Sequence, residues 1–171
     1  HQALGWAPTA VFLVAGIGLL QGVQVLAARA MGEGNPQGAG MALRRGLIIA
    51  IVTGIIAAVA MAAWGENLFL TFGIDAELAG PSAVVMSVLA ISIPMHLIYI
   101  AGTFFLEAIK KPVISTAVMW AANILNLVLN LWLVPEHGAV GSAWATVGAR
   151  IFLAAAILAA IWFLRDGAYY G

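Results

Sequence analysis

Five long stretches of this chain contain only one charged side chain between them, Arg150. They run approximately over residues 6–28, 46–64, 81–106, 113–134 and 140–164. A helix needs about 20 apolar residues to cross the hydrocarbon core of a bilayer. Only 8% of the 171 residues are charged, and the mean hydropathy is +1.06, whereas a soluble domain carries about 25% charged residues. The sequence therefore predicts an all-α, polytopic transmembrane helix bundle of about five spans.

The remaining composition excludes several classes of function. Seven Lys and Arg balance seven Asp and Glu, so the chain lacks the basic character of a nucleic-acid-binding protein. With no cysteine there is neither a disulfide framework nor a thiol site. The three histidines, His1, His96 and His137, are too far apart in sequence to suggest a metal site, and the spans contain no paired carboxylates. We predict neither a catalytic site, nor a metal site, nor a nucleic-acid partner.

The basic residues predict the orientation of the bundle. One set of predicted loops holds six Lys or Arg, and the other set holds none. Because cytoplasmic loops carry the excess of Lys and Arg, the C-terminal end is predicted to be cytoplasmic and His1 extracytoplasmic, in a multi-pass protein of the cytoplasmic (plasma) membrane. We also expect at least one helix to precede a chain that starts outside at His1. The six basic residues are Arg29, Arg44, Arg45, Lys110, Lys111 and Arg165.

Three amides share one face of the fourth predicted span. Asn123, Asn126 and Asn130 follow a spacing of i, i+3, i+7, which places them on the same side of a helix. Each amide offers donors and an acceptor without fixed charge, so the column can hydrate a cation or a polar drug inside a cavity. The alternative is interhelical hydrogen bonding.

The last span carries a second polar face, formed by Ser142, Thr146 and Arg150. At a rise of about 1.5 Å per residue, Arg150 lies near the middle of the membrane. A charge at that depth has to reach a water-filled cavity, a carboxylate or the cytoplasmic surface. Glu107 is the acid nearest to the expected side. Arg150 is therefore a candidate for a cavity or gating role, with a structural pair as the alternative.

The third span has Ser92, His96, Tyr99 and Thr103 on a single face, and Pro94 predicts a kink beside His96. His96 is a candidate for carrying a proton near neutral pH. A neutral histidine that only donates or accepts a hydrogen bond is the alternative reading.

The first span contributes Gln21 and Gln24, which we predict to line a cavity. They lie beside the pair Gly18-x-x-x-Gly22, a pattern typical of close helix packing in membranes.

Four segments together resemble one transporter family. They are Gln21-Gly-Val-Gln-Val-Leu-Ala-Ala-Arg-Ala-Met-Gly-Glu-Gly-Asn35 with Arg44-Arg-Gly46, then Phe105-Leu-Glu-Ala-Ile-Lys-Lys-Pro112, Asn123-Ile-Leu-Asn-Leu-Val-Leu-Asn130 and Gly138-Ala-Val-Gly-Ser-Ala-Trp-Ala-Thr146. In order and character they are similar to helices two to six of MATE (multidrug and toxic compound extrusion) transporters.

This resemblance implies a secondary antiporter that exports drugs and amphipathic organic cations across the lipid bilayer. It implies sodium or a proton as coupling cation, no other cofactor, and two six-helix lobes, of which this chain lacks the first helix and the second lobe. In some family members an Asn and an Asp on helix five and a Thr on helix six surround a cation. Asn126 matches that Asn, Thr146 matches the Thr, and Asn130 stands where the Asp would be.

Two other functions remain open at this level. One is a flippase for lipid-linked saccharides from the same superfamily, which needs several Arg or Lys to hold a pyrophosphate. The other is a membrane scaffold that transports nothing, in which the polar faces serve only helix packing.

Overall fold

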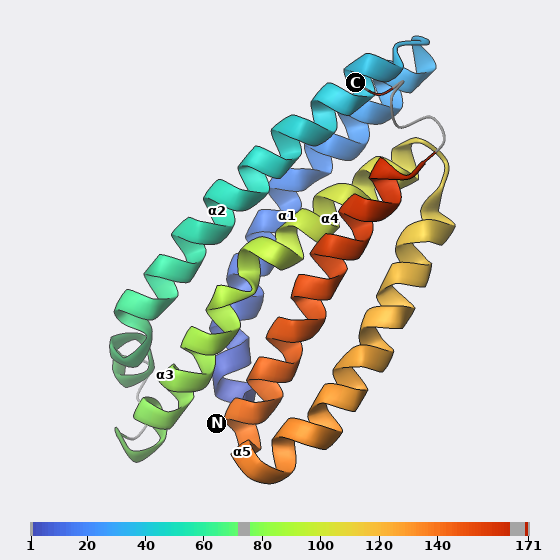
Figure 1. Ribbon diagram of the computed structural model, residues 1–171. Coiled ribbons are helices and arrows are strands. Elements are labelled where there is room, and N and C mark those ends of the chain that lie inside the picture. The colour runs from blue at the N-terminus through green and yellow to red at the C-terminus, as the bar shows by residue number, and fades with distance from the viewer. Residues whose placement is uncertain (1, 72–75, 165–169, 171) are drawn as a thin grey trace.

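The computed structural model describes residues 2–71, 76–164 and 170, and Figure 1 shows them as a bundle of helices. Every regular element within these residues is a helix, which confirms the predicted all-α class. The helices are α1 (Gln2–Gly32), α2 (Pro36–Thr71), α3 (Ala76–Ile91), α4 (Ile93–Ala108) and α5 (Pro112–Trp162).

Helix α5 folds back on itself at Gly138. The backbone there has φ 55° and ψ −131°, outside the helical region, and glycine is the residue that adopts such angles without a clash at Cβ. Figure 1 shows the two arms, residues 112–137 and 139–162, running in opposite directions. The chain thus turns back through the bundle at this residue, close to the predicted boundary between the fourth and fifth spans.

Three helices in the described residues are long and apolar enough to cross a membrane, and the bent pair of α3 and α4 makes a fourth candidate. One of the three is α5, whose two arms count as separate segments. The two arms, α1, α2 and the bent pair of α3 and α4 together match the five spans that the apolar stretches predict. The bend between α3 and α4 is 41° and lies at Ser92, two residues before Pro94. This bend confirms the predicted kink beside Pro94. Its cause is that proline has no N–H to continue the helical hydrogen-bond ladder.

Small residues let the helices pack closely around α4. A Cβ at Gly54 of α2 would overlap the backbone of Pro94, and one at Gly102 would collide with Ile157 of α5. Close approach through small residues is the usual way in which helices associate in lipid. The largest fully buried side chains of α4 follow from this packing, and they are Ile93, Leu97, Phe105 and Leu106.

The basic residues gather at one end of the bundle. The α1–α2 and α4–α5 connections lie at this end, whereas the start of α1, the end of α2, the start of α3 and the turn at Gly138 lie at the other (Figure 1). Arg29, Arg44, Arg45, Lys110 and Lys111 belong to the first end by their positions in these helices and connections. Of the residues used for the orientation, His1 and Arg165 lie outside the described part of the chain. Which end faces the cytoplasm stays a prediction.

Replacing Gly138 by alanine tests the backbone requirement at the turn. A Cβ at Gly138 would meet no atom within 4 Å, so the cost is one of backbone conformation and we expect a loss of about 1–3 kcal/mol of stability. Gly32→Ala is the matched control, because it adds a methyl group in open space at an exposed helical residue and should be neutral or stabilising. Thermal unfolding of the purified full-length protein in detergent measures both variants, and equal effects would contradict the assignment.

Candidate functional site

Arg150, on the second arm of α5, is buried inside the bundle with only 5% of its surface exposed. Its Nη1 donates a hydrogen bond of 2.8 Å to the Oγ of Ser92, which is itself fully buried. Ser92 in turn donates to the carbonyl of Leu89 over 2.6 Å. The single charge of the predicted spans is therefore bound at the break between α3 and α4, and a charge-assisted hydrogen bond of this kind is stronger than a neutral one.

Glu107 has a different partner. Its Oε2 accepts a hydrogen bond of 2.8 Å from the Nε2 of Gln24, which joins α1 to α4 near the basic end of the bundle. Gln24 is thus engaged between two helices within the described chain, while Gln21 is exposed on α1. A Cβ added at Gly18 or Gly22 would meet nothing within 4 Å, so no described residue packs closely against this glycine pair, and its role in packing stays a prediction.

The predicted polar face of the third span packs against α5. Besides the Ser92 contact, the hydroxyl of Tyr99 donates to the carbonyl of Ser115 over 3.2 Å, on the first arm of α5. The rings of His96 and Tyr99 lie 6.2 Å apart. The Nδ1 of His96 and the Oγ1 of Thr103 are buried and have no hydrogen-bond partner among the described residues. This face carries two direct links to α5 and two polar atoms still open to a further donor or acceptor.

Asn126 and Asn130 form a pair on the first arm of α5. The Nδ2 of Asn130 donates to the backbone carbonyl of Asn126 at 2.8 Å and to its Oδ1 at 3.1 Å. Both side chains are half-buried, whereas Asn123 is exposed. The Oδ1 of Asn130 and the Nδ2 of Asn126 make no hydrogen bond within the described chain. An amide oxygen in this position can coordinate a cation or accept a hydrogen bond from a ligand.

Thr146 lies on the opposite arm of the same hairpin. It is half-buried, and its Oγ1 donates to the carbonyl of Ser142 over 3.0 Å. A Cβ at Gly148 would touch Leu129, so Asn130 and Thr146 lie at about the same level of the two arms. The predicted site residues of α4 and α5 thus fall into a buried group around Arg150 and a half-exposed group around Asn130, while Gln21 and Gln24 on α1 belong to neither.

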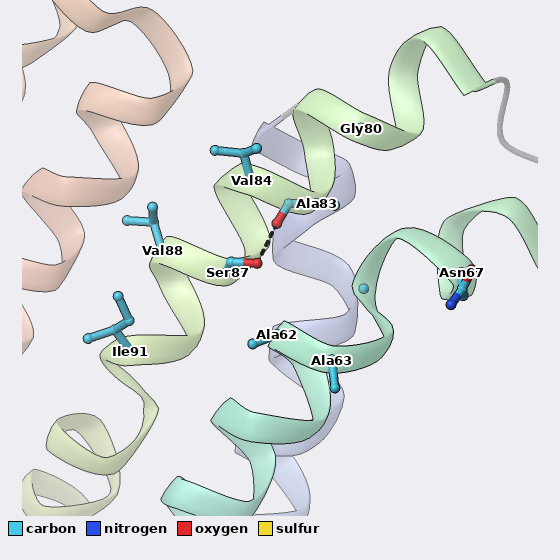
Figure 2. Close-up of a pocket in the computed structure, with 10 residues that line it drawn as sticks. Ala62, Ala63, Asn67, Gly80, Ala83, Val84, Ser87, Val88 and Ile91 are labelled. Atoms are coloured by element: carbon cyan, nitrogen blue, oxygen red, sulfur yellow. Dashed lines mark hydrogen bonds between the residues drawn. The ribbon is translucent and has the colours of Figure 1, made fainter.

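A cavity of about 490 Å³ between α2 and α3 has no predicted site residue in its lining (Figure 2). Small apolar side chains dominate the lining, and Asn67 and Ser87 are its polar members. The hydroxyl of Ser87 donates to the carbonyl of Ala83 within its own helix over 2.8 Å. Sequence analysis missed this cavity because alanines, glycines and one serine in two separate spans carry no signal of a shared space.

A model of the MatE family matches residues 2–132 of the chain. The probable multidrug resistance protein NorM of Caulobacter vibrioides is 42% identical over 96% of this chain. Multidrug and toxin extrusion protein 2 of Mus musculus is 26% identical over 88% of it. The chain spans 36% and 26% of the length of these two relatives.

Solved structures show the same fold. An inward-facing multidrug resistance MATE family transporter of the MOP superfamily superposes with a TM-score of 0.88 at 21% identity, over 96% of this chain and 38% of that one. A MATE structure in the bent conformation superposes with a TM-score of 0.86 at 22% identity, over 97% of this chain and 37% of that one. At this identity the likeness concerns the arrangement of the helices alone.

Replacing Ser92 by alanine tests the link between Arg150 and the helix break. Arg150 loses a buried hydrogen-bond acceptor, so we expect the free energy of unfolding to fall by about 1–3 kcal/mol. Ser87→Ala is the matched control on α3, since Ser87 is half-buried and bonds only within its own helix, and it should have little effect. Thermal unfolding of the full-length protein in detergent compares the two, and an equal or smaller loss for Ser92→Ala would contradict the role of this contact.

Proposed function

The chain belongs to the MatE family, and we propose that it forms part of the first lobe of a multidrug efflux transporter in the cytoplasmic membrane. The observation that carries this proposal is the 42% identity to the NorM relative over 96% of the chain. Because the chain spans 36% of that relative, we further propose that a preceding helix and a second lobe complete the transporter.

We assign the cargo to drugs and amphipathic organic cations, and the driving force to a gradient of sodium ions or protons. The pair of Asn126 and Asn130 supports this assignment, because it offers an open amide oxygen on a half-buried surface. Neutral oxygens attract a cation without holding it as strongly as a carboxylate would. In this proposal the face of α5 that carries the pair looks onto a cavity between two lobes, which alternately open to either side of the membrane.

The flippase alternative is less well supported. Binding a pyrophosphate in a membrane cavity calls for several cationic side chains. Within the described residues Arg150 is the buried basic side chain, and its Nη1 is engaged by Ser92. Arg44, Arg45 and Lys110 are exposed at the basic end of the bundle, far along the helices from the Asn130 level.

Replacing Asn126 or Asn130 by leucine tests whether the amide pair serves transport or packing. We expect drug efflux by the full-length protein to fall about tenfold, the equivalent of roughly 1.4 kcal/mol of lost cation or cargo binding, at unchanged membrane abundance. Ala121→Leu, at an exposed position on the opposite face of the same arm, is the control and should transport normally. Efflux is measured in cells or vesicles from a strain without its own pumps, and abundance by immunoblot. A parallel loss of abundance and efflux would favour the scaffold alternative.

Replacing Asn130 by aspartate tests the coupling cation. A carboxylate binds sodium more strongly than an amide and can also take up a proton near its pKa, so we expect the dependence of efflux on pH or on sodium concentration to shift. The assay compares efflux by wild type and variant across pH at fixed sodium, and across sodium at fixed pH. Identical profiles would remove Asn130 from the cation path.

A further inference from the structure

A groove lies between the last turns of α1 and the first turns of α2, at the basic end of the bundle. It encloses about 260 Å³ and is called the α1–α2 groove below. Its charged lining consists of Arg29, Glu33 and Arg45, and its apolar lining includes Leu26 and Met41. None of these residues belongs to either group of predicted transport residues, so the groove calls for an explanation of its own.

Both arginines of the groove have N–H donors that no described residue accepts from. The Nε of Arg29 donates to the Oε1 of Glu33 over 2.8 Å, and within the described chain this ion pair leaves both terminal nitrogens of Arg29 open. Arg45 makes no hydrogen bond or ion pair to the described residues. Two guanidinium groups therefore line one groove with terminal N–H donors available, and arginine binds phosphate oxygens with two parallel hydrogen bonds.

An apolar track leads from the groove along the two helices. Leu19 lies seven residues before Leu26, and Ile48 lies seven residues after Met41, so each pair shares one helix face. All four side chains are more than half exposed. The track runs away from the charged end and into the part of the bundle that the bilayer surrounds.

We propose that the α1–α2 groove binds the phosphodiester headgroup of an anionic glycerophospholipid, whose acyl chains lie along the apolar track. Arg29 and Arg45 hold the phosphate, while Glu33 fixes the Arg29 side chain through its Nε. Two cations and one anion leave a net charge of +1 in the groove, which matches a lipid of one negative charge. Basic pockets between helices near one surface of a membrane are suited to such headgroups.

Other occupants fit the groove less well. Free phosphate would use the arginines but gain nothing from the apolar track. A cationic drug would be repelled by a groove of net positive charge. The site is independent of the proposed cargo and coupling ion, because it rests only on the insertion of this bundle in a bilayer.

Binding is measured on the purified full-length protein in a neutral detergent, by native mass spectrometry with phosphatidylglycerol and with phosphatidylcholine as probes. We expect phosphatidylglycerol to bind more tightly, and Arg45→Gln to weaken it at least about fivefold, the effect of removing one cation near an anionic headgroup. Arg44→Gln is the matched control. Arg44 is the preceding residue and is also exposed, but it lines a different cavity beside Phe105 and Trp162, so binding should stay as in wild type.

A variant that binds the lipid more tightly is a further test, because misfolding cannot explain a gain of affinity. Glu33→Gln keeps an oxygen that can accept from the Nε of Arg29 and raises the net charge of the groove from +1 to +2, so it should tighten phosphatidylglycerol binding. Three results would overturn the proposal. The first is equal binding of the two lipids. The second is an equal loss of binding for Arg44→Gln and Arg45→Gln, which indicates only diffuse electrostatic attraction. The third is displacement of the lipid by millimolar inorganic phosphate, which indicates a site for the free anion.

Discussion

The hydrogen bond from Arg150 to Ser92 joins the two places where this bundle departs from continuous apolar helix. A guanidinium in the hydrocarbon region is costly unless it is paired, and so is the gap that Pro94 opens in a backbone ladder that no water can reach. In the structure the guanidinium is bound at the helix break. The hydroxyl of Ser92 accepts a hydrogen bond from Arg150 and donates one to the carbonyl of Leu89. The second arm of α5 is thereby fixed against α3 and α4, and the positions of the other polar groups depend on that arrangement.

The glycines determine how closely α4 can approach its neighbours. Gly54 brings α2 onto the backbone of Pro94, and Gly102 brings α4 onto Ile157 of α5. In lipid there is little hydrophobic drive for helices to associate, so such contacts between small residues carry much of the packing. At the break itself, α2 contacts Pro94 through Gly54, and α5 contacts Ser92 through Arg150. Ser92 and Ile93 are fully buried, so protein, and not lipid, surrounds the break.

The long apolar runs determine most of the fold, because one period of hydropathy and one membrane thickness allow few alternatives. The bend at Pro94 was equally predictable, since it follows from one missing N–H. The partner of Arg150 was not. A serine and an arginine 58 residues apart carry no mutual signal, and a search for a buried cation's partner naturally turns to carboxylates such as Glu107. That acid bonds to Gln24 instead, a contact that depends on how α1 crosses α4. The cavity between α2 and α3 is likewise a property of two surfaces and not of either sequence.

The polar residues of the spans divide by exposure, and the division separates what holds the bundle from what is available to a ligand. Arg150, Ser92 and Tyr99 are buried and bonded between helices, so changing them alters the packing first. Asn126 and Asn130 bond to each other on one helix and keep an oxygen and an amino group open at a half-buried surface. A site that binds and releases its cargo needs donors and acceptors that the fold does not already use. The amide pair satisfies that condition. The buried Arg150 instead fixes the second arm of α5 against Ser92, and so holds the hairpin whose other arm carries the pair.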